Sequence, residues 1–476
     1  MISRSRNGCF NCKRRKRRCD ETRPHCHACI ARNVECEGYQ RPVRWVNGVA
    51  SRGHLAAAPM GSPYSEARSV GLSALPVTAA RLPMPARIDV LGSTSGNDVV
   101  LSAQEDEERL LFRKFLEDGI QRVCNAQIGQ QLVLFFKDIS RRSRTLVMVL
   151  AALQLLLDNG PDVSSLAFID RAIGAFRSEL SELRYPGSID LLSCGLFTCT
   201  ICILQAQPFT QYLRPLTEIH NLTEGFDKID PELASNPISW HLVEVLSVMD
   251  LPPFVVGRRS PSLGLWKRIR GRIPHDNHTA HSDVEIVSGM PKDLLDIFAD
   301  IMDFRDETII ARFWNWRCSL ADPIQTHRCN SWRYAGILDL RRRRALSAMQ
   351  HPNDHTSDKH FADPQEPRSE TVLTGLLSSL EAFCQGCEAA GYDKQIFLNH
   401  GLLYPIMLAS LEVKMLDANP SWRQLLDNAK EKISHRLQID SAKPLFDLLD
   451  EAATGHHDLF DIETVAYNRG IEIALF

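Results

Sequence analysis

The stretch CFNCKRRKRRCDETRPHCHACIARNVEC, residues 9–36, decides how the N-terminal part of this chain folds. Its cysteines are separated by two, six, six, two and six residues, a spacing too regular for chance. Residues 1–7 are short and polar and do not read as a secretory signal, so we expect metal ligands rather than disulfides. The candidate ligands are Cys9, Cys12, Cys19, Cys26, Cys29 and Cys36.

The number of cysteines predicts two zinc ions. Two tetrahedral zinc sites need eight metal–sulfur bonds, and six thiolates supply eight when two of them bridge both ions. Such an arrangement leaves no open position for water or substrate, so we expect a structural metal centre and not a catalytic one.

The six cysteines form an internal repeat in which the two halves differ in charge. The pattern of the first half recurs seventeen residues later, and in each half the second and third cysteines are seven apart, about two turns of a helix. Two short helices around one metal cluster are therefore expected. The gap of the second half holds Arg32 as its one cation, whereas the gap of the first half is wholly basic, so we expect the first half to contact DNA. The candidate DNA-binding residues are Lys13, Arg14, Arg15, Lys16, Arg17 and Arg18.

These residues resemble the fungal zinc binuclear cluster transcription factors, whose cysteine spacing they match throughout, as does Pro24. The resemblance implies that Cys9 and Cys26 bridge the two ions. It also implies that the first helix enters the major groove, where Arg15 and Lys16 read a CGG-type triplet. Simple helix geometry instead directs Arg14, Arg17 and Arg18 away from the metals, a conflict that is resolved if the helix ends early and presents its C-terminal end to the bases.

The charge distribution is consistent with a DNA-binding tip. Residues 1–45 contain 12 basic and 4 acidic residues, and the remainder contains 43 basic and 54 acidic ones. The formal net charge of −3 therefore conceals a basic segment on an acidic body. A body of that charge is expected to avoid DNA.

Residues 39–100 are rich in Ala, Ser, Pro, Gly and Arg, which predicts a linker, largely disordered. No heptad repeat persists over three heptads, so a coiled-coil zipper is not expected. The tract 44–55 resembles a segment that follows the cluster in some of these factors. For Arg44 and Arg52, phosphate contact and a plain linker role both remain open.

Residues 101–476 predict a large all-α domain. Ser102 and Glu105 form a capping-box pattern that predicts a helix start, and the apolar run Leu146 to Leu157 is too short to cross a bilayer and predicts a buried helix. The segments 288–295 and 402–409 resemble parts of the fungal-specific transcription factor domain, which implies a regulatory role. In the helix that is expected to start at Ser102, one apolar face would be formed by Phe112, Phe115, Leu116, Ile120 and Val123. Further helices are predicted at Val163 to Leu183, Asp190 to Gln205, Trp240 to Met249, Lys292 to Phe304, Glu370 to Ala390 and Trp422 to Leu437.

Other patterns have simpler interpretations. The Cys-x-x-Cys pairs Cys199/Cys202 and Cys384/Cys387 lie among helix formers and are interpreted as core residues. The histidines at 275, 278 and 281 are interpreted as a solvated loop, as is the segment 350–368, and Gly257 to Pro261 as a helix end. No phosphate-binding loop or nucleophile elbow occurs, so no enzyme is predicted.

The sequence thus predicts a small zinc-stabilised two-helix binuclear cluster module at 7–38, a linker at 39–100 and an all-α regulatory domain at 101–476. The expected function is sequence-specific DNA binding in the nucleus, as an RNA polymerase II transcription factor. The expected partners are double-stranded DNA containing CGG and the transcription machinery or co-regulators, without a membrane; a homodimer and a monomer both remain open. A zinc-storage or redox-sensing thiolate protein, or a helical scaffold without specific DNA reading, is the alternative.

Overall fold

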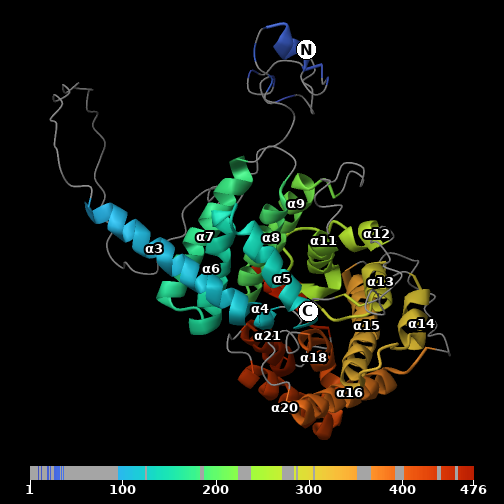
Figure 1. Ribbon diagram of the computed structural model, residues 1–476. Helices are drawn as coiled ribbons and strands as arrows, with labels where there is room; N and C mark the ends of the chain where they lie inside the picture. Colours follow the sequence, from blue (N-terminus) through green and yellow to red (C-terminus); the bar gives the residue numbers. More distant parts are fainter. Residues whose placement is uncertain are drawn as a thin grey trace, which may run out of the picture. The chain divides into compact units, whose positions relative to one another are not determined.

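The computed structural model divides the chain into two compact units, Met1–Gly96 and Asn97–Phe476 (Figure 1). In the smaller unit most of the described residues are the six cysteines and residues near them in sequence. In the larger unit the described residues are mostly helical. The structure describes residues 9, 12, 15, 19, 20, 22, 26–32, 34, 36, 95–123, 126–182, 187–222, 237–270, 284–285, 288–303, 306–350, 366–391, 401–436, 441–455 and 459–476.

The described elements are nearly all helices. The smaller unit has α2 at His27–Ile30. Helix α3, Ser95–Lys114, begins two residues before the larger unit and is continued there by the π-helical turn η1 at Phe115–Gly119 and by α4 at Ile120–Val123. The other elements of the larger unit are α5 (Ala126–Ile139), α6 (Arg144–Asn159), α7 (Val163–Glu182), α8 (Ile189–Leu204), α9 (Thr210–Ile219), α11 (Pro237–Met249), η3 (Pro252–Phe254), β1 (Val255–Val256), α12 (Leu265–Arg270), α13 (Lys292–Asp300), α14 (Thr308–Asn315), α15 (Pro323–Gln350), α16 (Ser369–Ala390), α18 (Leu403–Ser410), α19 (Val413–Ala418), α20 (Pro420–Arg436), α21 (Lys443–Thr454), α22 (Ile462–Arg469) and β2 (Ile473–Ala474).

Helix α6 lies at the centre of the first half of the larger unit, where it packs against α7 and α8. It begins after Ser143, whose side-chain oxygen accepts a hydrogen bond from the N–H of Leu146 at 3.1 Å. Most of its apolar run is buried, because α6 has neighbours on several sides, and this confirms the predicted buried helix. Across the described residues, no helix is both long and apolar enough to span a membrane.

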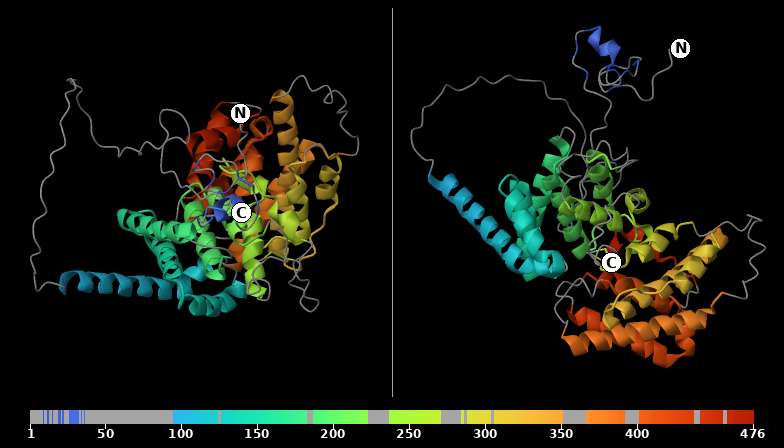
Figure 2. Two further views of the ribbon diagram at one scale, coloured as in Figure 1. Left: turned by 90° about the horizontal axis from the view of Figure 1, so that it is seen from above. Right: turned by 45° about the vertical axis from the view of Figure 1, so that its right-hand side comes forward.

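The second half of the larger unit is built on α15 and α16, which run side by side (Figures 1 and 2). Five aromatic side chains from η3, α13, α14, α15 and α18 meet beside this pair. Neighbouring rings have their centroids 4.8 to 5.8 Å apart, mostly edge to face, the arrangement that aromatic quadrupoles prefer. These rings, Phe254, Phe298, Phe313, Trp332 and Tyr404, connect segments that are distant in sequence.

A two-stranded antiparallel sheet joins the end of the chain to the middle of the larger unit. Val255 pairs with Ala474, and Val256 with Ile473. The N–H of Leu475 also donates to the carbonyl of Phe254 at 2.9 Å. The C-terminal residues are buried there and belong to the core.

Most predicted helices are confirmed within a few residues, as α6, α7, α8, α11, α16 and α20. Helix α13 ends at Asp300, earlier than predicted. The expected helix start at Ser102 is wrong, since α3 begins at Ser95. Residues 95–98 are Ser, Gly, Asn and Asp, which also suit a helix start, so the capping pattern was not unique.

The segment Gly257 to Pro261 does not end a helix, which corrects the sequence interpretation. It follows strand β1, and Gly257 has a φ of +73° that a side chain would strain. Arg258 turns inward and its Nη2 pairs with the buried carboxylate of Asp250 at 2.6 Å. The basic residues here therefore serve the internal structure of the unit.

Candidate metal centre and nucleic-acid interface

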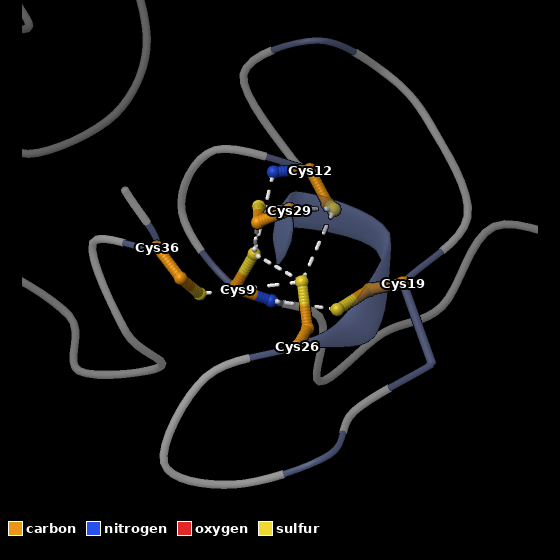
Figure 3. Close-up of a cluster of buried hydrophobic side chains, with 6 residues drawn as sticks. All are labelled: Cys9, Cys12, Cys19, Cys26, Cys29 and Cys36. Carbon is orange, nitrogen blue, oxygen red and sulfur yellow. Dashed lines mark hydrogen bonds between the residues drawn. The ribbon is translucent and has the colours of Figure 1, made fainter. Parts of the chain in front are cut away.

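The sulfur atoms of the six N-terminal cysteines converge on one small volume (Figure 3). All six side chains are buried, although they belong to a short segment with few apolar residues. The sulfurs form two overlapping groups of four, and within each group all lie within 4.8 Å of one another. One group is Cys9, Cys12, Cys19 and Cys26, and the other is Cys9, Cys26, Cys29 and Cys36.

Cys9 and Cys26 are common to both groups, and their sulfurs lie 3.5 Å apart. The sulfur of Cys26 is 3.8 Å from that of Cys12 in one group and 4.0 Å from that of Cys36 in the other. A tetrahedral zinc with bonds of about 2.3 Å places its sulfurs about 3.8 Å apart. These separations fit two such sites that share an edge, although the sulfurs of Cys12 and Cys29, which belong to different groups, are also 4.0 Å apart.

Without a bound metal ion, burial favours the protonated form of these thiols. Burial raises the pKa of Cys9 to about 12, and it also raises the pKa values of Cys12 and Cys26. The thiolate is the form that binds metal, so metal binding has to displace these protons. Two backbone groups favour the anionic sulfurs: the N–H of Cys9 lies 3.4 Å from the sulfur of Cys19, and that of Cys12 lies 3.5 Å from the sulfur of Cys9.

Asp20 links the two halves of the cluster, a role that the sequence analysis did not predict. Its carboxylate accepts hydrogen bonds from the N–H groups of His27 and Ala28, each at 3.0 Å, and so caps the first turn of α2. The hydroxyl of Thr22 also donates to it. The Thr22 hydroxyl and the Ala28 N–H hold the pKa of Asp20 well below its usual range. The one sequence feature that could have indicated this capping role is the position of the Asp, directly after the third cysteine and six residues before Cys26.

The second half of the cluster is not a helix from Cys29 to Cys36, which corrects the expected geometry. Helix α2 ends at Ile30, and the N–H of Val34 then bonds to the carbonyl of Cys29 at 3.2 Å in a turn. Residues seven apart on a helix are about 10 Å apart along its axis. That separation is too large for two sulfurs of one four-sulfur group, so the chain has to turn back.

The basic run is only partly described by the structure. Arg15 lies in a turn and is exposed, as expected for a side chain that contacts a large ligand. Lys13, Arg14, Lys16, Arg17 and Arg18 lie outside the described residues, as do Pro24, Arg44, Arg52 and the segment 271–283 with its histidines.

The two Cys-x-x-Cys pairs of the larger unit are core residues, as predicted. Cys199 and Cys202 are buried in α8, and burial raises the pKa of Cys202 to about 12. Cys384 and Cys387 are buried in α16. Among the described residues, the side-chain groups that could hold a metal ion are the two cysteine groups of the smaller unit.

Residues 7–46 match the family model of the fungal Zn(2)-Cys(6) binuclear cluster domain. This segment is therefore a zinc cluster domain, which binds two zinc ions. The geometry of the six sulfurs fits that cofactor.

Similar curated proteins are named as transcriptional regulators. The chain is 46% identical over 52 residues to the transcriptional regulatory protein pro1 of Neurospora crassa, covering 11% of this chain and 7% of pro1. It is 42% identical over 48 residues to the transcriptional regulatory protein moc3 of Schizosaccharomyces pombe, covering 10% and 9%. It is 53% identical over 36 residues to the aspercryptin biosynthesis cluster-specific transcription regulator atnN of Emericella nidulans, covering 8% and 6%.

These similarities span less than a tenth of the length of each of the three relatives. No solved structure matches the chain.

Proposed function

We propose that this protein is a sequence-specific DNA-binding regulator of transcription. The observation that carries the proposal is a buried cage of six sulfurs with a run of six cations between its second and third cysteines. The cage is closed, since each four-sulfur group fills a tetrahedral site, and a closed zinc site acts as a structural support and not as a catalyst. We assign Cys9 and Cys26 as bridging ligands because both groups share them, and the other four cysteines as terminal ligands.

The basic run supports DNA as the partner. The two zinc ions and six thiolates together carry a formal charge of −2, and the 12 basic residues of the segment 1–45 outweigh this charge and that of its 4 acidic residues. A compact cationic module attracts a polyphosphate backbone and releases its counterions. A protein that only stores zinc or senses oxidants needs the thiolates but not the six cations between them.

In finer detail, we propose that Arg15 and Lys16 read the guanines of a CGG-type triplet in the major groove. Both side chains can donate to guanine O6 and N7. Lys13, Arg14, Arg17 and Arg18 then contact phosphates and contribute affinity that does not depend on sequence. The exposure of Arg15 is compatible with this role.

The larger helical unit is proposed to be the regulatory region, a fungal-specific transcription factor domain that receives a signal or recruits co-regulators. The protein would act in the nucleus on genes transcribed by RNA polymerase II. The names of the three relatives support this proposal, because each is called a transcriptional or transcription regulator. A homodimer would require contacts of the helical unit, since no zipper pattern follows the cluster.

The test is a binding measurement on the full-length, zinc-loaded protein. Affinity for a labelled duplex containing CGG is compared with affinity for a scrambled duplex of the same composition, by fluorescence anisotropy at several salt concentrations. The Arg15→Ala/Lys16→Ala variant is compared with Lys137→Ala/Arg141→Ala, which removes two exposed cations from the helical unit. Zinc content is measured for each protein.

The wild type should prefer the CGG duplex. The Arg15→Ala/Lys16→Ala variant should keep its zinc and lose that preference, because each guanine contact contributes about 1–3 kcal/mol of discrimination. The control variant should resemble the wild type. Absence of any preference in the wild type would refute the proposal, and zinc retention without DNA preference would favour the storage function.

A further inference from the structure

A pocket of about 360 Å³ lies in the larger unit, between helix α9 and the segment that leads into α12. Both helices pack against α11 (Figure 1). The volume is at the lower end of the range found for small-molecule sites, so it suits a compact ligand. The lining residues come from α9 on one side, and from α12 and the segment before it on the other: Arg214, Thr217, Glu218, Ser262, Leu263 and Arg268.

Hydrogen bonds within the fold hold the two walls of the pocket in place. The carboxylate of Asp250, which is 1% exposed, accepts from the hydroxyl of Ser262 at 3.0 Å and from the N–H of Leu263 at 2.9 Å. The N–H of Ser260 donates at 3.1 Å to the hydroxyl of Thr210, the first residue of α9. The segment before α12 is thereby tied to both α11 and α9. Walls that are already ordered lose less entropy when a ligand binds.

The cations of α12 differ in whether the fold neutralises them. The Nζ of Lys267 lies 2.5 Å from the carboxylate of Asp300. The Nε of Arg270 lies 3.0 Å from that of Asp296, and both of these acids belong to α13. Arg268 is exposed and lines the pocket instead, and within the described part of the chain it has no ion pair or hydrogen bond. It is therefore the cation of α12 that is open to a ligand.

The second arginine of the pocket is only weakly engaged. The Nη1 of Arg214 lies 3.7 Å from the Oε1 of Glu218, one turn further along α9, and both side chains are about half exposed. Solvent screens such a pair, so it contributes little and leaves the guanidinium able to interact with a ligand. Two arginines and one glutamate give the pocket a formal charge of +1, which a monoanion neutralises.

We propose that this pocket binds a small organic acid with a single carboxylate. The carboxylate binds the guanidinium of Arg268, whose planar set of N–H groups matches two carboxylate oxygens, and Arg214 adds a second positive charge. Leu263 provides the apolar lining for a short carbon chain. Glu218 repels a second carboxylate and so selects against dicarboxylates. Binding at this site does not depend on the proposed DNA-binding function and is measured without DNA.

The first experiment measures the binding of valerate to the full-length, zinc-loaded protein by isothermal titration calorimetry at low ionic strength. Valeramide is the uncharged control of similar shape, glutarate has the same number of carbons and a second carboxylate, and inorganic phosphate is an anion without a carbon chain. Zinc content is measured before and after each titration, so that removal of zinc from the cluster is recognised.

Valerate should bind saturably and more tightly than the three other probes, and its affinity should fall as salt is added, because salt screens the charges of an exposed site. Absence of saturable valerate binding would overturn the proposal, as would equal affinity for valeramide. Tighter binding of phosphate or glutarate than of valerate would overturn the assigned class of ligand.

Arg268→Ala should weaken valerate binding about tenfold or more, since it removes the charged hydrogen bonds to the carboxylate. Lys267→Ala is the matched control, because it removes the neighbouring cation of the same helix, which does not line the pocket. Circular dichroism confirms that both variants are folded. Equal losses in the two variants would show that binding follows the charge of α12 and not the pocket, and would refute the proposal.

Glu218→Gln should change the affinity in the opposite direction. Removal of its charge releases Arg214 and ends the repulsion of the ligand, so valerate should bind about threefold more tightly, and glutarate should gain more than valerate. A residue that only supports the local structure would weaken binding when it is replaced. Unchanged or weaker valerate binding in this variant would therefore contradict the proposed position of the carboxylate.

The last experiment locates the bound acid without any substitution. The reagent p-hydroxyphenylglyoxal modifies arginine side chains, and mass spectrometry of chymotryptic peptides reports the rate at each position. Saturating valerate should slow the modification of Arg268 and Arg214. It should not affect Arg141, whose side chain is 82% exposed and lies outside the pocket. An unchanged rate at Arg268 would place the acid elsewhere and overturn the proposal.

Discussion

Replacement of a shared cysteine should cost the protein two zinc ions, whereas replacement of an unshared one should cost one. Cys9 belongs to both four-sulfur groups, and its sulfur is 3.5 Å from that of Cys26 and 3.7 Å from that of Cys29. Cys9→Ser leaves each zinc with three sulfurs, because serine is not among the side chains that bind zinc. Cys36→Ser leaves the group of Cys9, Cys12, Cys19 and Cys26 complete.

The size of the effect follows from the thermodynamics of small zinc domains. Binding of a structural zinc contributes about 10–16 kcal/mol in zinc-finger peptides, more than the net stability of many domains, about 5–15 kcal/mol. The smaller unit has its sulfurs as its buried cluster, with Ala28 packed against them, so little else can hold it together. Loss of both ions should unfold the cluster, and loss of one should leave it weakened.

The assay is zinc stoichiometry on purified full-length protein, with circular dichroism to confirm that the helical unit remains folded. We expect about two zinc ions per chain in the wild type, about one in Cys36→Ser, and almost none in Cys9→Ser. Cys202→Ser, a buried cysteine of α8, should retain two. Equal stoichiometry in Cys9→Ser and Cys36→Ser would refute the assignment of Cys9 as a shared ligand.

Three further outcomes are expected. Asp20→Asn should make the cluster release zinc to a chelator faster than wild type, because a neutral amide caps α2 less well than a carboxylate; equal release rates would show that the cap is dispensable. Asp250→Ala should destabilise the helical unit by about 3–5 kcal/mol in urea unfolding, since it removes a buried carboxylate and leaves the guanidinium of Arg258, whose side chain is 13% exposed, without its ion-pair partner. Burial lowers the pKa of His241 to about 4, so the unfolded chain takes up its proton first as the pH falls below 6.5, and stability is lost. Between pH 7 and pH 5 this histidine should account for about 2 kcal/mol of lost stability, and urea unfolding of His241→Gln should lack that share.

The sequence predicted several helices that have a continuous apolar face and missed α15, which buries charge. Helix α15 is the longest described helix, yet arginines interrupt its apolar pattern. Several of them are buried because the fold supplies acceptors: Arg333, for example, donates through Nη1 to the carbonyl of Trp314 at 3.0 Å. The run Arg341 to Arg344 looks like a basic patch but has partners along its whole length, in Ser369, Pro367, Phe460, Asp339 and Asp306. Except for Asp339, which precedes Arg343 by four residues on α15, these acceptors are distant in sequence, and no local sequence pattern predicts them.

For the zinc cluster, spacing predicted the ligands but not the path of the chain between them. The repeat suggested two equivalent helices because cysteines seven apart share a helix face. Two cysteines that bind the same metal ion must also lie close together, which a shared helix face alone does not ensure. The turn after α2 meets this requirement because it brings Cys36 back toward Cys26. The capping by Asp20 was also hidden, since it joins the two halves of the repeat and only the folded cluster brings them together.

The cysteines show most clearly why spacing alone does not determine chemistry. In the N-terminal segment, thiols crowd together without a carboxylate in either sulfur group, and only cations can make the resulting charge stable. In α8, a pair with redox spacing is surrounded by apolar side chains, and burial keeps both sulfurs protonated and inert. The same functional group is thus a metal ligand in one unit and an inert core residue in the other, according to which groups the fold places next to it.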